Sequence, residues 1–290
     1  MNVYRSEAGR RALQDWCRAE LDRALPTARR RTLPTCLGPT HLTTVGSGPG
    51  VVLLPGTNFG AATSTPLISA LSRSFQVTAV DTPGQPGLSS GQRPIDDLVT
   101  QHQHWFTQVL RGISANSGPL LLVGESLGAV AALCGDPTPE VRGLVLVAPA
   151  GLIEARVDLV TLRATLPWLL RPTPRRAARL LATMAAGAPI ADHDRLVEWM
   201  AMVPNHARSS LAPAPLPNVT IAAWQHTPCR VVVGEHDRFF PPPRLAGVAR
   251  STLHATTRVV PDAGHLVAHT APEAVVEAAA ELHGVSKDSS

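Results

Sequence analysis

The chain has 290 residues, of which 44% are hydrophobic and 17% are charged. These proportions are ordinary for a globular protein with a sizeable core, and an α/β fold of this length can form a single unit. The net charge of +4 comes from scattered basic residues without interleaved aromatic side chains, which argues against nucleic-acid binding. The four cysteines lie far apart and indicate neither a disulfide framework nor a zinc site.

Residues 1–9 lack the apolar stretch of a secretory signal, and no run approaches the roughly 18 apolar residues that span a bilayer. We therefore expect a soluble, cytoplasmic protein with no membrane partner. The sequence leaves the oligomeric state open.

The N-terminal part, residues 1–39, predicts one helix followed by a connection. Apolar side chains recur at helical spacing among charges over residues 7–25, and Pro26 ends this pattern. Residues 27–39 are rich in Arg, Thr and Pro and are expected to lead into the core. Residues 40–45 alternate weakly and predict a first edge strand.

Short apolar runs then follow one another, and most of them end in Gly, Pro or Asp. The predicted strands are 51–54, 77–80, 120–123, 144–147, 231–233 and 258–260, and segments of helical composition lie at 64–73, 96–113, 126–135, 241–250 and 271–283. Uninterrupted apolar strands indicate burial on both faces of a sheet. The alternation predicts an α/β fold with a mostly parallel central sheet flanked by helices.

This alternation stops between residues 152 and 224, where no strand pattern occurs. Apolar and arginine residues mix at helical spacing over 159–170 and 177–184, with prolines between them. The region predicts a helical cap that divides the core into residues 40–151 and 225–290. Insertions of this length commonly serve the active site.

The strongest chemical signal is Gly-Glu-Ser-Leu-Gly at residues 124–128. It lies between an apolar strand and a helical stretch, the context of a nucleophile elbow. The sharp turn would strain the backbone of Ser126 and lift its hydroxyl off the sheet edge. Glycines at 124 and 128 fit, because strand and helix would approach too closely for a Cβ atom.

A serine nucleophile needs a base within hydrogen-bond reach and a third group that orients the base. Asp237 follows the predicted strand at 231–233, and His265 follows the strand at 258–260. Because the carboxyl ends of parallel strands share one edge, we expect both to lie near Ser126. Glu235 is an alternative acid. His269 is expected to face away from Ser126 or to cap a helix.

Together and in this order, the motifs resemble the α/β-hydrolase superfamily, in its branch of small esterases with a helical cap. The resemblance covers roughly residues 40–284. It rests on residues 54–57, 81–89, 124–128, 234–237 and 264–265. It implies a triad of Ser126, His265 and Asp237, with Asp237 rather than Glu235 as the acid.

The resemblance also implies an oxyanion hole made by the backbone N–H groups of Thr57 and Leu127. This sequence departs from the family at Pro55, where many relatives have a histidine before the glycine. The side chain of Asn58 could then assist.

The stretch 81–89 is interpreted as a structural turn after the strand at 77–80. It contains neither G-x-G-x-x-G opening a helix nor G-K-[ST], so nucleotide binding is not expected. No ligand spacing implies a cofactor or a metal.

The resemblance implies a serine hydrolase that cleaves a carboxylic ester, lactone or thioester of a small, largely apolar substrate through an acyl-enzyme on Ser126. Cap residues could line its pocket or simply pack against the core. The candidates are Trp168, Leu169, Trp199, Met200 and Met202. The alternatives are an acyltransferase or specialised biosynthetic enzyme on the same fold, and a small-molecule receptor.

Overall fold

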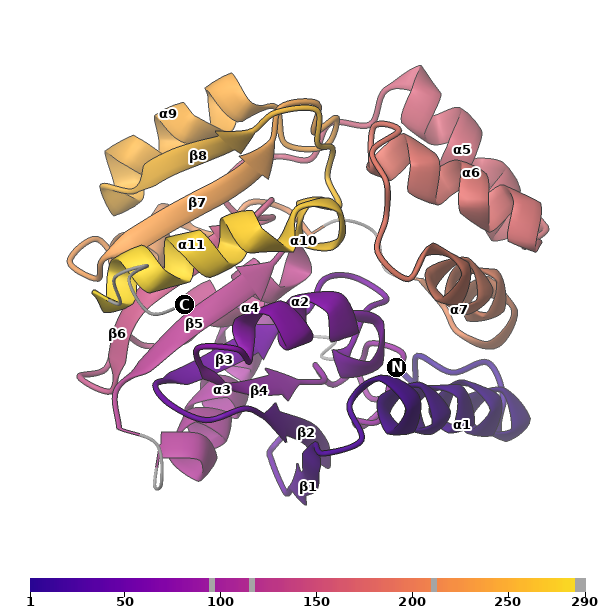
Figure 1. Cartoon of the computed structure of the whole chain (residues 1–290), viewed down its shortest axis with the longest axis horizontal. Coiled ribbons are helices and arrows are strands. Elements are labelled where there is room, and N and C mark those ends of the chain that lie inside the picture. Colours follow the sequence, from indigo (N-terminus) through magenta and orange to yellow (C-terminus); the bar gives the residue numbers. More distant parts are fainter. Residues whose placement is uncertain (94–96, 115–117, 210–212, 285–290) are drawn as a thin grey trace.

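A computed structural model of the chain describes residues 1–93, 97–114, 118–209 and 213–284. Its strands form one sheet in the order β1-β2-β4-β3-β5-β6-β7-β8 (Figure 1). The strands are β1 Arg29–Leu33, β2 Thr40–Val45, β3 Gly50–Leu54, β4 Gln76–Val80, β5 Leu120–Glu125, β6 Val141–Val147, β7 Cys229–Gly234 and β8 Thr256–Val260. Only the β1–β2 and β2–β4 pairs are antiparallel, so the predicted mostly parallel sheet is confirmed.

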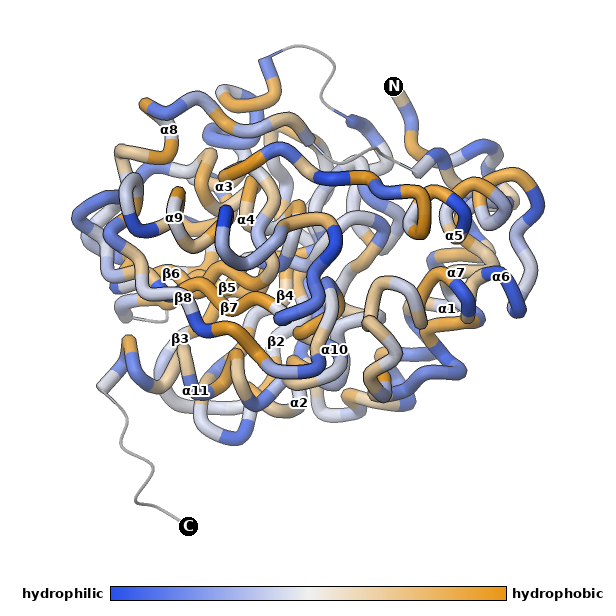
Figure 2. The backbone as a smooth tube through the Cα atoms, turned by 90° about the horizontal axis from the view of Figure 1, so that it is seen from above, coloured by the Kyte–Doolittle hydropathy of each residue, from blue (hydrophilic) through white to orange (hydrophobic). Residues whose placement is uncertain are grey.

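Helices cover both faces of the sheet, because alternate apolar side chains of each strand point to opposite sides. Val51 and Leu53 pack into a cluster with the short helix η1 and with α2, α10 and α11, whereas Val52 and Leu54 pack with α3, α4 and α9. The helices are η1 Ala61–Thr63, α2 Thr65–Leu71, α3 Leu98–Ser114, α4 Leu127–Leu133, α9 Pro242–Leu253, α10 Val267–Thr270 and α11 Pro272–His283. Figure 2 shows the apolar strands gathered at the centre between these layers.

The predicted strands and core helices are present, with boundaries shifted by a few residues. The first residue of the helix predicted at 96–113, Asp96, lies outside the described residues. None of the helices in the described part of the chain has the length and hydropathy that a bilayer-spanning helix needs.

The expectation for residues 27–39 was wrong in one respect. Arg29–Leu33 is not a plain connection but strand β1, which pairs with β2. Its first four residues are exposed, so it has no apolar pattern to reveal it. Charged side chains are typical of an edge strand, since they oppose pairing with a further chain. Strand β2 exists as predicted, but it lies one position in from the edge.

The N-terminal helix α1 (Glu7–Ala24) begins and ends as predicted. The Ser6 side chain accepts a hydrogen bond from the Gly9 N–H, which is an N-cap. The helix packs on α7 (His193–His206), where the rings of Trp16 and Trp199 lie 4.9 Å apart. The N-terminal segment therefore packs against the region 152–224 and helps to hold it in place.

Region 152–224 contributes helices α5 (Leu159–Leu170), α6 (Pro174–Met184), α7 and α8 (Asn218–Ala222). Asp158 and Thr173 are N-caps, whose side chains accept from backbone N–H groups in the first turns of α5 and α6. Figure 1 shows α5, α6 and α7 gathered to one side of the sheet. The division of the chain at residues 39, 151 and 224 remains a prediction.

Candidate active site

Ser126 lies at the turn between β5 and α4, with φ 50° and ψ −110°. This positive φ is strained for a residue with a side chain, and such strain gathers at functional sites. A Cβ atom on Gly128 would lie 1.8 Å from the Leu54 carbonyl oxygen, and one on Gly124 would lie 2.7 Å from the Ala129 Cα. The close approach of strand and helix therefore requires both glycines, as the motif predicts.

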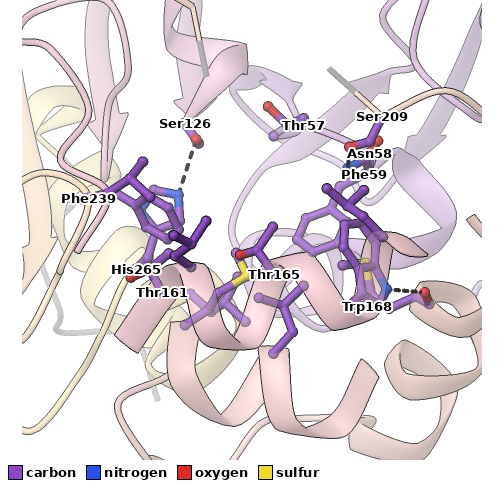
Figure 3. Close-up of a pocket in the computed structure, with 18 of the residues that line it drawn as sticks. Thr57, Asn58, Phe59, Ser126, Thr161, Thr165, Trp168, Ser209, Phe239 and His265 are labelled. Atoms are coloured by element: carbon purple, nitrogen blue, oxygen red, sulfur yellow. Dashed lines mark hydrogen bonds between the residues drawn. The ribbon is translucent and has the colours of Figure 1, made fainter. Parts of the chain in front are cut away.

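The structure brings the three predicted triad residues together. Figure 3 shows His265 beside Ser126 at the cavity. His265 Nδ1 lies 2.9 Å from Asp237 Oδ2, and His265 Nε2 lies 3.2 Å from Ser126 Oγ. An ionised carboxylate only accepts hydrogen bonds, so Asp237 favours the tautomer that leaves Nε2 free to accept the serine proton. The other oxygen, Asp237 Oδ1, accepts from the Phe239 and Phe240 N–H groups at 2.8 and 3.0 Å.

The electrostatics of the buried His265 favour its cation. Burial alone would lower the pKa of His265, but the charge and hydrogen bond of Asp237, with a contribution from Glu125, outweigh burial and raise that pKa above its usual value. A base in this setting can hold the proton that it takes from a hydroxyl group.

The predicted oxyanion donors lie beside Ser126. Thr57 lines the same cavity as Ser126, and Leu127 follows the serine directly as the first residue of α4. Neither backbone N–H has an acceptor among the described residues. Their assignment as oxyanion donors remains a prediction.

Asn58, the residue expected to assist the oxyanion donors, lines the same cavity, and its assisting role remains a prediction. Its Nδ2 donates to Ser209 Oγ at 2.8 Å, and its backbone N–H donates to Gln85 Oε1 at 3.0 Å. Its carbonyl oxygen accepts from Trp199 Nε1 at 2.8 Å. Asn58 therefore anchors the loop that carries Thr57.

Glu125 and His269 form a buried pair that the sequence analysis missed. Glu125 is 3% exposed and His269 is 2% exposed, and His269 Nε2 lies 3.5 Å from Glu125 Oε1. Glu125 Oε2 has no hydrogen-bond partner among the described residues. His269 is thus buried against the residue before the serine, a contact that the expectation for this residue did not include.

A cavity of about 480 Å³ opens above Ser126, and its walls are mainly apolar. Of the predicted lining residues, Trp168, Leu169 and Met200 line it, whereas Trp199 and Met202 do not. Trp199 is instead fully buried between Trp16 and the Asn58 carbonyl. Further lining residues are Thr161, Leu162, Thr165, Leu166, Leu180, Met184, Phe239 and Phe240.

Residues 51–278 match the model of the Alpha/beta hydrolase family. The chain belongs to the alpha/beta hydrolase family. The resemblance drawn from the motifs is thereby confirmed, and the fold of this hydrolase has close counterparts. Carboxylesterase CesB (YbfK) from Bacillus subtilis matches with a TM-score of 0.77 and 19% identity, over 95% of this chain and 98% of that one. The naproxen esterase of the same organism matches with a TM-score of 0.74 and 19% identity, over 93% and 97%.

Among curated proteins, this hydrolase is similar to pimeloyl-[acyl-carrier protein] methyl ester esterases. The Xanthomonas oryzae pv. oryzae protein is 31% identical over 109 residues, which cover 37% of this chain and 40% of that protein. The Shewanella oneidensis protein is 28% identical over 165 residues, which cover 54% and 59%. The chain therefore aligns with less than two thirds of the length of these relatives.

The contacts of Asp81 bear on the interpretation of residues 81–89. Asp81 accepts from the Ala61 and Leu88 N–H groups at 2.8 and 2.9 Å, which supports the interpretation of residues 81–89 as a structural turn. Glu235, His236 and Asp262 could each offer one ligand atom to a metal, and these atoms lie within 4.8 Å of one another. All three side chains are exposed, and exposed acidic groups often gather without a metal.

Proposed function

We propose that this hydrolase cleaves a carboxylic ester, lactone or thioester of a small, largely apolar substrate. The observation that supports this most directly is the hydrogen-bonded chain from Asp237 through His265 to Ser126 at an apolar cavity. The curated relatives are named as methyl ester esterases, which supports a carboxylic ester as the substrate class.

In the proposed mechanism, Ser126 Oγ attacks the acyl carbon while His265 Nε2 accepts the hydroxyl proton. Asp237 orients the imidazole and stabilises its cation. The Thr57 and Leu127 N–H groups bind the oxyanion of the tetrahedral intermediate. His265 then protonates the leaving group, which departs and leaves the acyl group on Ser126. In the second half of the reaction, His265 deprotonates a water molecule, which attacks the acyl carbon and releases the acyl group from Ser126.

We further propose that residues 152–224 act as a cap that selects the substrate. Helix α5 supplies Thr161, Leu162, Thr165, Leu166 and Leu169 to the cavity wall. Because these groups are mainly apolar, they favour an apolar acyl or alcohol group. An acyltransferase would use the same acyl-enzyme but prefer an alcohol or amine acceptor over water, and a receptor would bind with little turnover.

Hydrolysis of p-nitrophenyl esters of increasing acyl length tests this proposal. We expect turnover by the wild type and a loss on the order of 10⁴-fold or more in Ser126→Ala, because the nucleophile is removed. The matched control is Ser251→Ala, an exposed serine on α9 that should leave the rate unchanged. A folded wild type that hydrolyses no ester, or a fully active Ser126→Ala, would contradict it.

A further inference from the structure

Helix α5 carries its large apolar side chains on the outside of the molecule. Among the described residues, seven of the eleven exposed large apolar side chains lie between residues 157 and 170. They are Val157, Leu159, Val160, Leu162, Leu166, Leu169 and Leu170. Leu159 is 69% exposed and Leu170 is 72% exposed. This concentration forms a patch rather than the usual scatter of single apolar residues.

The leucines of α5 share one face of the helix. Leu159, Leu162, Leu166 and Leu170 recur every three or four residues, which places them along one stripe. Thr161, Ala164 and Trp168 are the buried residues of the helix and lie on the opposite face. A surface helix normally packs its leucine stripe inward, whereas this stripe, the α5 stripe, points outward. Figure 2 places α5 at the edge of the molecule.

The sequence of α5 and α6 is strongly basic, and the acidic residues on either side of it, Asp158 and Asp192, pair with Arg238 and Arg23. Residues 159–191 include five arginines and no aspartate or glutamate. The arginines are Arg163, Arg171, Arg175, Arg176 and Arg179. None of them forms an ion pair within the part of the chain that the structure describes. Arg176 Nη1 donates to the Arg171 carbonyl oxygen at 2.8 Å, so the arginines of α6 lie next to the C-terminal end of α5.

The α5 stripe also borders the active-site cavity. Leu162 and Leu166 of the stripe, together with the neighbouring Leu169, line the cavity that contains Ser126, yet each is more than a third exposed. Leu159 and Leu170, at the two ends of the stripe, do not line it. The stripe therefore runs from the cavity wall to the outer surface of the protein.

We propose that the α5 stripe and the arginine cluster form a docking surface for an anionic lipid surface. Leucines on one face of a helix can enter the boundary between headgroups and acyl chains, while arginines pair with anionic headgroups. A second copy of the chain would bring the same positive charge and be repelled. This proposal goes beyond the proposed function and does not depend on it.

Binding to the surface of a bilayer does not require a helix that spans it. Helix α5 has 12 residues, which is too short to cross a bilayer but sufficient to lie in its surface. Surface binding of this kind would revise the expectation of no membrane partner.

Vesicle cosedimentation with the full chain tests the proposal. We expect binding to vesicles of equal parts phosphatidylglycerol and phosphatidylcholine, weaker binding in high salt, and little binding to pure phosphatidylcholine. Leu159→Ser with Leu170→Ser should weaken binding by roughly tenfold or more, because apolar area no longer enters the lipid. Arg175→Gln with Arg179→Gln should weaken it by roughly 25-fold, about fivefold for each charge.

The matched control is Val219→Ser with Val259→Ser, two exposed apolar residues outside the patch that should leave binding unchanged. Thermal melting confirms that each variant is folded. Ser126→Ala should bind vesicles like the wild type, so a failure of ester hydrolysis and a failure of docking are distinguished. No binding to either vesicle, or binding insensitive to lipid charge and to the α5 variants, would overturn the proposal. So would a dimer that Leu159→Ser with Leu170→Ser dissociates.

Discussion

Asp237 divides its two oxygen atoms between different partners. Oδ1 accepts from two backbone N–H groups, which fixes the carboxylate, and this leaves Oδ2 for His265. Glu125 adds a second buried negative charge near His265, and the described partner of that charge is His269. The pKa of His265 is thus raised by Glu125, the residue directly before Ser126, as well as by Asp237.

Glu125→Gln should shift the acidic limb of the pH profile of kcat/KM to lower pH. His265 acts as a base only when neutral, so activity falls as the pH drops through its raised pKa. Removing the Glu125 charge removes one of the causes that raise this pKa. The pH profile of ester hydrolysis measures the shift. Glu235→Gln is the control, since this exposed carboxylate should not move the limb. An unshifted limb in Glu125→Gln would assign Glu125 a purely structural role.

The sequence could predict that Ser126, Asp237 and His265 meet, because each follows a strand and parallel strands end at one edge. It could not predict the Glu125–His269 pair. That contact depends on how the short helix α10 turns back against β5, and no spacing encodes it. The positions of Trp199 and Met202 were also undetermined, because an apolar residue on a cap helix can face either the cavity or the core.

At the scale of helices and loops, the loop before His265 lies very close to the end of α6. A Cβ atom on Gly264 would lie 2.2 Å from the Met184 carbonyl oxygen and 2.7 Å from the Ala185 carbonyl carbon. A backbone at that distance cannot give way as a flexible side chain can. Gly264 therefore couples the position of α6 to that of His265, the proposed base.

Gly264→Ala should displace either the α6 terminus or the His265 loop. We expect a loss of about 1–3 kcal/mol in the free energy of unfolding from overpacking, and a fall of about 10²-fold in kcat/KM from misplacement of His265. Urea denaturation and ester hydrolysis measure the two effects. Gly247→Ala is the control, because nothing lies within 4 Å of the added atom; it should keep full activity and gain about 0.5–1 kcal/mol in helix α9. Equal behaviour of the two variants would refute the coupling.

Strand β1 shows why one element escaped prediction. The strands β3 to β7 have neighbours on both sides and contain apolar runs, whereas the edge strand β1 is mostly exposed and reads Arg-Arg-Arg-Thr-Leu. Only pairing with β2 makes it a strand, and pairing leaves no trace in its own residues.

On the scale of the whole molecule, the N-terminal helix α1 packs against α7 of the region 152–224. Glu20 on α1 is 1% exposed and pairs with Arg23 on its own helix and with Arg195 on α7. Burial alone would raise the pKa of Glu20, but hydrogen bonds and charges from the two arginines outweigh it and hold the pKa below its usual value. The sequence predicted the helix but not its partner, since nothing in residues 7–25 points to α7.

Glu20→Gln should lower the free energy of unfolding by about 2 kcal/mol at neutral pH, since a buried charge-assisted pair is lost. The folded-state pKa of Glu20 is depressed, so its contribution is complete above the usual glutamate pKa and disappears as the pH falls through the folded value. Urea denaturation at several pH values measures this. Glu7→Gln breaks an exposed pair with Arg10 and should change nothing measurable. A pH-independent loss in Glu20→Gln would argue against the ion pair.

The most direct test of the account is covalent labelling of the nucleophile. Intact-mass measurement after incubation with a fluorophosphonate, followed by peptide mapping, should show one adduct on Ser126 in the wild type. Ser126→Ala should gain no adduct, and His265→Ala should react far more slowly because the base is missing. A folded wild type that stays unlabelled, or an adduct on another residue that persists in Ser126→Ala, would contradict the assignment of Ser126 as the nucleophile of this hydrolase.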